Sequence, residues 1–332
     1  MLLCVLLFVS LCLSQPSPAV LFEGARLITG DGSAPVENSS FLVENGRITR
    51  VGRKGEVRAP AGAVRVDLSG KTVMPALVDT HVHLGYQRGS TFSADNFKRE
   101  YLIDLLNKYA YCGFGAVVSL GTDPNDLPFQ IRADQLSGRL VGTALFLTAG
   151  RGLAAPDAGP NAPELKPSAY GVTTEDEARR YVREQIAKKV DFIKIWVDDR
   201  NGTVKKLSPV LYRAIIDEAH KRDTRVIAHI FYLADAKDLA RAGIDGFAHL
   251  IRDREADVEL VALLKQRKVS VMPNLAISEN GTHAEPPAWL NDPLLHDVVA
   301  AEDIERVRAT YAKRSRDAVE RARNTYGMMQ RT

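Results

Sequence analysis

The chain has 332 residues, of which 45% are hydrophobic and 26% charged, the composition of an ordinary globular protein. This composition excludes disordered, collagen-like and coiled-coil classes, and a formal net charge of +3 without a basic run argues against nucleic acid as a partner. Only Cys112 lies beyond the first fifteen residues, which excludes an internal disulfide framework.

The first predicted element is an apolar run over residues 2–13, followed by a segment rich in Ser and Pro. The run is shorter than the ~20 residues that a membrane span needs, but it has the length of the apolar region of a signal peptide. The basic residues that usually precede such a region are absent. We expect residues 1–19 to be a signal peptide, the protein to be exported to the periplasm or the extracellular space, and no stable membrane span to form.

Residues 20–73 contain short runs of alternating apolar residues, which predict a small N-terminal β-sandwich segment. Asn45-Gly46 lies between two of these runs. This dipeptide is the strongest short signal for a two-residue β-hairpin turn. We therefore expect antiparallel strands on either side of it.

From residue 74 onward, short apolar runs alternate with helical stretches, which predicts a parallel sheet in an α/β fold. The predicted strands are residues 74–83, 116–120, 140–147, 192–197, 225–230, 244–249 and 269–272. The predicted helices are residues 95–111, 174–189, 209–222, 233–242, 257–268 and one long charged helix at about 300–323. Gly113 and Gly243 are expected to end helices in the left-handed conformation.

Polar residues at the carboxyl ends of these strands favour a (β/α)8 barrel of the TIM type over an open sheet, because barrel active sites lie at those ends. Only seven strands are countable, so strand eight is missing. We expect residues 74–332 to form a (β/α) barrel that is incomplete at its C-terminus, in a chain that is C-terminally truncated.

Four histidines lie at the ends of predicted strands. His81 and His83 are two residues apart, so their side chains leave the same face of one strand. His229 and His249 end two later strands and are separated by about one strand and one helix. Neutral imidazole is the commonest protein ligand for zinc, and four such histidines predict a metal centre.

Lys194 lies inside the apolar run of residues 192–197, where a charged ammonium is costly to bury. Burial would leave part of the amine neutral and able to react with carbon dioxide, giving an anionic carbamate that can bridge two metal ions. The alternative is an ordinary ion pair with Asp198 or Asp199.

These residues resemble the amidohydrolase superfamily, and most closely its imidazolonepropionase-like and prolidase-like metal-dependent hydrolases. The resemblance covers about residues 20–325. It depends on the β segment leading into residues 73–84, with His81 and His83, on Lys194 in Phe-Ile-Lys-Ile, and on His229 and His249.

The resemblance implies hydrolysis of a carbon–nitrogen bond by a metal-bound hydroxide, with a non-peptide amide, a cyclic amide or an Xaa-Pro-like dipeptide as substrate. It implies one or two divalent ions, with zinc expected, held by His81, His83, His229, His249 and Lys194 as a carbamate formed with carbon dioxide. Lys194 and His249 are the expected catalytic residues. A small-molecule amide is the expected partner, with homo-oligomerisation left open.

One expected residue of the family, an aspartate at the end of strand eight, is not found. Gly121-Thr122-Asp123 imitates its signature, but it follows the second barrel strand, so Asp123 is not expected to be catalytic. The alternative function is therefore a truncated, catalytically inactive metal-binding relic. An unrelated aldolase that uses Lys194 for a Schiff base is a weaker alternative, because it needs no cluster of histidines.

Overall fold

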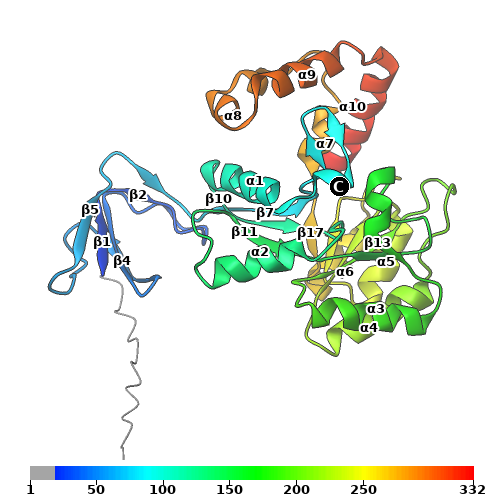
Figure 1. Ribbon diagram of the computed structural model, residues 1–332, viewed down its shortest axis with the longest axis horizontal. Coiled ribbons are helices and arrows are strands. Elements are labelled where there is room, and N and C mark those ends of the chain that lie inside the picture. The colour runs from blue at the N-terminus through cyan, green and yellow to red at the C-terminus, as the bar shows by residue number, and fades with distance from the viewer. Residues whose placement is uncertain (1–18) are drawn as a thin grey trace, which may run out of the picture. The chain divides into compact units, whose positions relative to one another are not determined.

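The computed structural model describes residues 19–332 and divides the chain into two units between Ala76 and Leu77 (Figure 1). The predicted signal peptide, apart from residue 19, lies outside the described residues, so export stays a prediction. Within residues 19–332, no helix combines the length and apolar character needed to cross a membrane.

The first unit contains a four-stranded sheet in the order β4–β3–β1–β5 and a separate β2–β6 pair. The strands are β1 (Val20–Glu23), β2 (Arg26–Leu27), β3 (Ser39–Glu44), β4 (Arg47–Arg53), β5 (Val64–Asp67) and β6 (Thr72–Val73). The hairpin prediction is confirmed, since β3 and β4 pair antiparallel around Asn45 and Gly46. Both turn residues have positive φ, 50° and 72°, as this turn requires. The β-sandwich itself stays a prediction.

The second unit is an α/β structure with two parallel sheets (Figure 1). The first sheet has the order β11–β10–β7, built from β7 (Leu77–Val82), β10 (Phe114–Ser119) and β11 (Leu145–Thr148). The second has the order β13–β12–β14–β15–β16–β17, built from β12 (Gly152–Ala154), β13 (Ala169–Gly171), β14 (Ile193–Val197), β15 (Val226–Ile230), β16 (Gly246–Ala248) and β17 (Ser270–Met272). A short hairpin of β8 (Gln87–Arg88) and β9 (Thr91–Phe92) follows β7.

Helices connect these strands. They are α1 (Arg99–Tyr111), α2 (Leu127–Leu136), α3 (Glu175–Ala187), α4 (Pro209–His220), α5 (Leu233–Ala242) and α6 (Val258–Arg267), followed by α7 (Leu275–Asn280), α8 (Pro293–Val298), α9 (Ala301–Tyr311) and α10 (Arg316–Arg331). Short 3-10 helices span Ala94–Asn96, Pro163–Ser168 and Ala288–Asn291. Gly113 and Gly243 have φ of 88° and 93°, so the predicted left-handed positions after α1 and α5 are confirmed.

The α/β prediction is confirmed, but a closed barrel is not present in the described chain. The two sheets meet where the Thr148 carbonyl accepts a hydrogen bond of 2.8 Å from the Asp191 amide. At the other side, β7 and β17 form no strand pairing. Strands lie near all seven predicted runs, but β12 and β13 lie in a segment where no strand was predicted.

The prediction of one helix over residues 300–323 is wrong. The structure has two helices there, α9 and α10, separated by residues 312–315. Ser315 begins the second helix as its N-cap, because its side chain accepts a hydrogen bond from the Ala318 amide. This cap stabilises a new helix start in the middle of the charged run.

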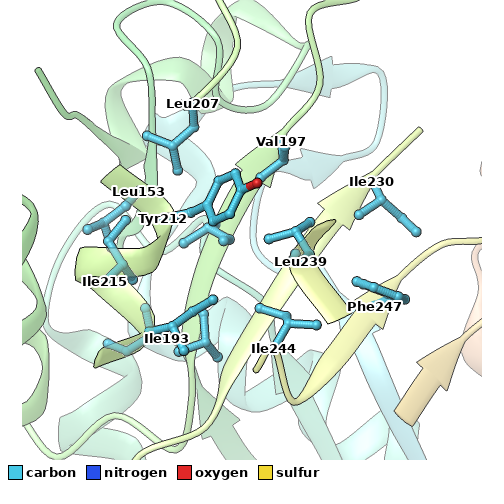
Figure 2. Packing of buried hydrophobic residues seen from close by; sticks show 14 of the residues in the cluster. Leu153, Ile193, Val197, Leu207, Tyr212, Ile215, Ile230, Leu239, Ile244 and Phe247 are labelled. Atoms are coloured by element: carbon cyan, nitrogen blue, oxygen red, sulfur yellow. The ribbon is translucent and has the colours of Figure 1, made fainter. Parts of the chain in front are cut away.

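The main hydrophobic core lies between the six-stranded sheet and helices α3, α4, α5 and α6 (Figure 2). Ile193, Ile195 and Val197 of β14 face it and are at most 1% exposed, and Ile215 of α4 is completely buried against the same cluster. The odd-numbered residues of β14 therefore pack on the helices. Because side chains alternate along a strand, the even-numbered residues point the other way, toward the strand-end site.

Truncation of Ile215 to alanine is expected to lower the free energy of unfolding by about 2–5 kcal/mol, because it leaves a cavity in this core. The matched control is Val210→Ala in the same helix, where the side chain is 58% exposed. That change is expected to stay within about 0.5 kcal/mol. Urea denaturation of the two variants measures both. Equal losses would contradict the assignment of the core.

Candidate metal centre

The four predicted histidines form one continuous cluster. His81 lies in β7 and His83 directly after it, His229 lies in β15, and His249 follows β16. The ring centroids of His81 and His83 are 5.1 Å apart, those of His81 and His249 are 4.9 Å apart, and those of His229 and His249 are 4.7 Å apart. His81 and His249 are 168 residues apart in the chain, yet the ends of their strands bring the two imidazoles together.

Lys194 is the buried cationic residue beside this cluster. It is 1% exposed, and its Nζ atom has no hydrogen-bond partner. Burial lowers the pKa of the amine to about 7. The centroid of the Trp196 ring lies 5.4 Å from Nζ. A buried polar atom without a partner is costly, so this amine is poised to acquire one.

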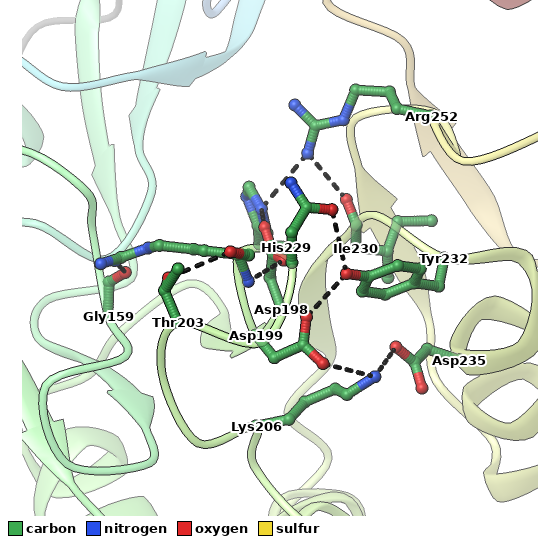
Figure 3. Close-up of polar contacts among 12 residues, drawn as sticks. Gly159, Asp198, Asp199, Thr203, Lys206, His229, Ile230, Tyr232, Asp235 and Arg252 are labelled. Carbon is green, nitrogen blue, oxygen red and sulfur yellow. Dashed lines mark hydrogen bonds and ion pairs between the residues drawn. The ribbon is translucent and has the colours of Figure 1, made fainter.

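The alternative of an ordinary ion pair for Lys194 is wrong, because both candidate carboxylates have other partners (Figure 3). Asp198 Oδ2 lies 3.1 Å from His229 Nε2. Asp199 accepts a hydrogen bond of 2.7 Å from the Tyr232 hydroxyl and lies 3.7 Å from Lys206 Nζ.

The imidazoles are held in their neutral form. Burial lowers the pKa of His81, of His83 to about 3 and of His229 to about 4, and the charge of Lys194 adds to each shift. For His249, burial is again the largest cause, followed by the charge of His229. Neutral imidazole is the form that binds a metal ion, so the protonation state suits the predicted role.

Outer residues hold one ring nitrogen of three of the histidines. His83 Nδ1 lies 2.8 Å from the Thr122 hydroxyl, and His229 Nε2 lies 3.1 Å from Asp198. The Asn274 side-chain amide nitrogen lies 2.9 Å from His81 Nδ1. Partners that can accept a ring N–H, as the Thr122 hydroxyl and Asp198 can, fix ring orientation in metal sites and leave the second nitrogen for the metal.

Thr122 and Asn274 were not predicted as site residues. The sequence feature that could have identified Thr122 as a site residue is its position in Gly121-Thr122-Asp123, at the end of β10. Asn274 follows β17 in the same way that the histidines follow their strands, and this position was its signal.

His249 has a backbone φ of 82°, in the left-handed region that non-glycine residues rarely adopt. Its amide donates a hydrogen bond of 2.9 Å to the Met272 carbonyl, which anchors the residue at the end of β16. Such strain costs of order 1–3 kcal/mol and concentrates at functional sites. The strained backbone places the imidazole between His81 and His229.

Asp123 makes its side-chain hydrogen bonds with residues of β10 and β11. It is 1% exposed, accepts a hydrogen bond of 2.5 Å from the Ser119 hydroxyl, and also accepts one from the Thr148 hydroxyl. Burial raises the pKa of this carboxyl to about 7. These contacts join the ends of β10 and β11, so Asp123 supports the turn that carries Thr122.

The arrangement fits a divalent metal in its donor chemistry. Nitrogen donors from four neutral imidazoles suit zinc and its neighbours, and the unpartnered Lys194 Nζ marks a buried polar position that a further ligand would satisfy. Within residues 19–332, however, no group of three or more His, Cys, Asp or Glu side chains has the spacing of a ready metal site. The histidines lie close together, but their side chains do not have the geometry of a complete metal-binding site.

The comparison with known family models finds no match. Among curated proteins, the chain is 28% identical over 232 residues to an uncharacterized protein of Mycobacterium tuberculosis, covering 66% of this chain and 55% of that protein. It is 34% identical over 110 residues to a dihydroorotase of Geobacter metallireducens, covering 33% of this chain and 23% of the dihydroorotase. The matches thus span about half or less of these relatives.

Solved structures share the fold. A prolidase-like protein from Bifidobacterium longum has a TM-score of 0.68 at 24% identity, covering 95% of this chain and 69% of that one. The A. niger ochratoxinase has a TM-score of 0.66 at 18% identity, covering 95% of this chain and 74% of that one.

The chain thus combines the α/β fold of these solved structures with imidazoles clustered at its strand ends. The resemblance to the amidohydrolase superfamily that the histidines and Lys194 indicated is confirmed by these relatives and structures.

Proposed function

We propose that the protein is a metal-dependent hydrolase that cleaves carbon–nitrogen bonds in small amides. The observation that carries this proposal is the convergence of four neutral, strand-end imidazoles beside the buried, unpartnered amine of Lys194. Relatives named enamidase and dihydroorotase support this class of reaction. The substrates to test are non-peptide amides, cyclic amides and Xaa-Pro-like dipeptides.

In this proposal, His81 and His83 would hold one divalent ion and His229 and His249 would hold a second, with zinc the expected metal. Such ions would lower the pKa of water and polarise a carbonyl group. Thr122 and Asp198 orient the rings of His83 and His229 by their hydrogen bonds.

Lys194 completes the ligand set as a carbamate. Its neutral amine attacks carbon dioxide, a nitrogen–carbon bond forms, one proton leaves, and an anionic oxygen pair replaces the free amine. The low pKa of Lys194 supports this step, because the unprotonated amine is the nucleophile and is accessible near neutral pH. The carbamate then satisfies a position that the structure leaves without a hydrogen bond.

The test is hydrolysis by the purified full chain, supplied with zinc and bicarbonate, on a panel of the three substrate classes. Activity that a chelator removes and zinc restores would support the proposal. Metal binding without hydrolysis of any class would favour the alternative, a catalytically inactive metal-binding relic. That alternative has the weaker support, because its only argument is the aspartate that the sequence analysis does not find.

Removal of the Thr122 hydroxyl tests the orientation of His83. Thr122→Val is expected to weaken zinc binding by about 10–100-fold, because the hydrogen bond that positions the ring is lost. Competition with a coloured chelator measures the affinity. The control is Thr310→Val, whose hydroxyl bonds only to the Val307 carbonyl on an exposed part of α9. An unchanged zinc affinity in Thr122→Val would show that Thr122 does not orient His83 for metal binding.

A further inference from the structure

A cavity of about 430 Å³ lies apart from the proposed metal centre, since none of the five expected ligands lines it. Two of its lining residues, Arg225 and Asp245, directly precede β15 and β16, and Lys268 lies shortly before β17. The cavity therefore opens at the amino ends of these parallel strands, whereas the histidines lie at carboxyl ends. Its volume falls in the range of about 300–1,000 Å³ that is usual for small-molecule sites.

One wall of the cavity is apolar. Its apolar lining residues are Val118, Leu120, Phe192, Ile227 and Met272. They belong to one hydrophobic cluster, in which Val118, Leu120 and Ile227 are buried. Within the described chain, β7 pairs only with β10 and β17 only with β16, so no strand covers this wall between β7 and β17. An apolar group that occupies the space would gain the free energy of leaving water.

Basic side chains lie at the mouth of the cavity. Arg225, Arg267 and Lys268 line it and are exposed, whereas the apolar lining residues are buried or half-buried. None of these three basic residues pairs with an acidic side chain among residues 19–332. Their charges are therefore available to an anion at the mouth.

Asp245 is the acidic residue of the lining, and it is already engaged. Its Oδ2 atom lies 2.9 Å from His220 Nε2 and accepts a hydrogen bond of 2.7 Å from the Val226 amide. Three cations thus accompany one carboxylate, which leaves an excess of positive charge. A cationic mouth beside an apolar wall is complementary to a molecule with an anionic head and an apolar tail.

We propose that this cavity binds a medium-chain fatty acid, with its alkyl chain on the apolar wall and its carboxylate beside Arg225, Arg267 and Lys268. The inference goes beyond the proposed hydrolysis, because it requires neither a metal ion nor a reaction. An extended peptide that pairs with the open edges of β7 and β17 is the competing occupant. The excess positive charge favours the fatty acid, since backbone pairing requires no anion.

Isothermal titration of the full chain, after dialysis against EDTA, measures this binding without metal. The probes are decanoate, decyltrimethylammonium, which has the same alkyl chain and a positive head, and hexanoate, which has the same head and a shorter chain. Each is used below the concentration at which it forms micelles. We expect one decanoate per chain, bound at least about tenfold more tightly than the cation, because charge-assisted hydrogen bonds are the strong ones.

Hexanoate is expected to bind at least about tenfold more weakly than decanoate, because each buried methylene group contributes about a fourfold gain in affinity. Met272→Phe, which places a larger side chain on the apolar wall, is expected to weaken decanoate more than hexanoate. Circular dichroism and thermal unfolding of each variant separate lost binding from lost folding.

The double variant Arg225→Gln/Lys268→Gln tests the mouth and is expected to weaken decanoate binding by about tenfold or more. The matched control is Lys265→Gln, which removes an exposed charge from the last turn of α6 at a residue outside the lining. That change is expected to alter the affinity by less than about twofold.

Four outcomes would overturn the inference. They are equal affinities for decanoate and the cation, an unchanged decanoate affinity in the double variant, binding of several decanoates per chain that no variant alters, and no binding of decanoate. The last is the result that a peptide occupant predicts. Absence of metal or of hydrolysis would defeat the proposed function, yet would leave this metal-free binding measurable.

Discussion

Replacement of Lys194 is expected to eliminate hydrolysis while leaving the fold intact. Loss of an outer-shell partner of a metal site typically costs about 10–100-fold in affinity or activity, so loss of a ligand is expected to exceed about a hundredfold. Lys194→Met keeps most of the side-chain volume and removes only the buried amine. Measurement of kcat/KM on the best substrate of the panel, at saturating zinc and bicarbonate, gives the effect.

The free energy of unfolding gives a second test of the role of Lys194. Because the amine is buried without a partner, its replacement by an apolar group of similar shape is expected to leave the free energy of unfolding unchanged or higher. The control is Lys205→Met, at an exposed position between β14 and α4. Lys194→Met that keeps full activity would contradict the role of the lysine as a ligand.

Gly121→Ala is expected to disturb both the fold and the site. Gly121 has a φ of 90°, and a Cβ atom there would lie 2.5 Å from Lys194 Cγ and 2.8 Å from Lys194 Cβ. The φ strain of an alanine costs about 1–2 kcal/mol, and overpacking costs about 1–3 kcal/mol more. We expect a loss of about 2–5 kcal/mol in the free energy of unfolding, with displacement of the lysine.

The matched control for Gly121 is Gly138→Ala. Gly138 has a similar φ of 75°, but its Cβ would meet no atom within 4 Å. This variant carries the backbone strain without the clash, so it is expected to lose only about 1–2 kcal/mol. Urea denaturation and zinc affinity of both variants give the comparison. Equal losses would show that Gly121 does not press against Lys194.

The sequence predicted the histidine cluster because its signal is local. Strand-end positions follow from short apolar runs, and parallel strands carry their carboxyl ends to one edge, so His81, His229 and His249 were expected to meet. The same reasoning predicted Lys194 as a site residue, since an amine inside an apolar run has few other roles. Its lack of an acidic partner became known only from the structure, which shows where Asp198 and Asp199 bind.

The remaining features depend on contacts that join distant segments. Asn274 and His81 are 193 residues apart and meet across β17 and β7, two strands that do not pair. No local pattern predicts that contact. Strands β12 and β13 were missed because residues 150–172 contain four prolines and four glycines, a composition typical of loops.

We propose that His81, His83, Lys194, His229 and His249 form a metal centre in this chain. Mass spectrometry of the purified full chain, with His229→Ala as the comparison, measures its metal content. We expect about one to two equivalents of zinc in the parent and loss of most of it in the variant. Less than about a tenth of an equivalent in the parent, after incubation with zinc, would contradict it.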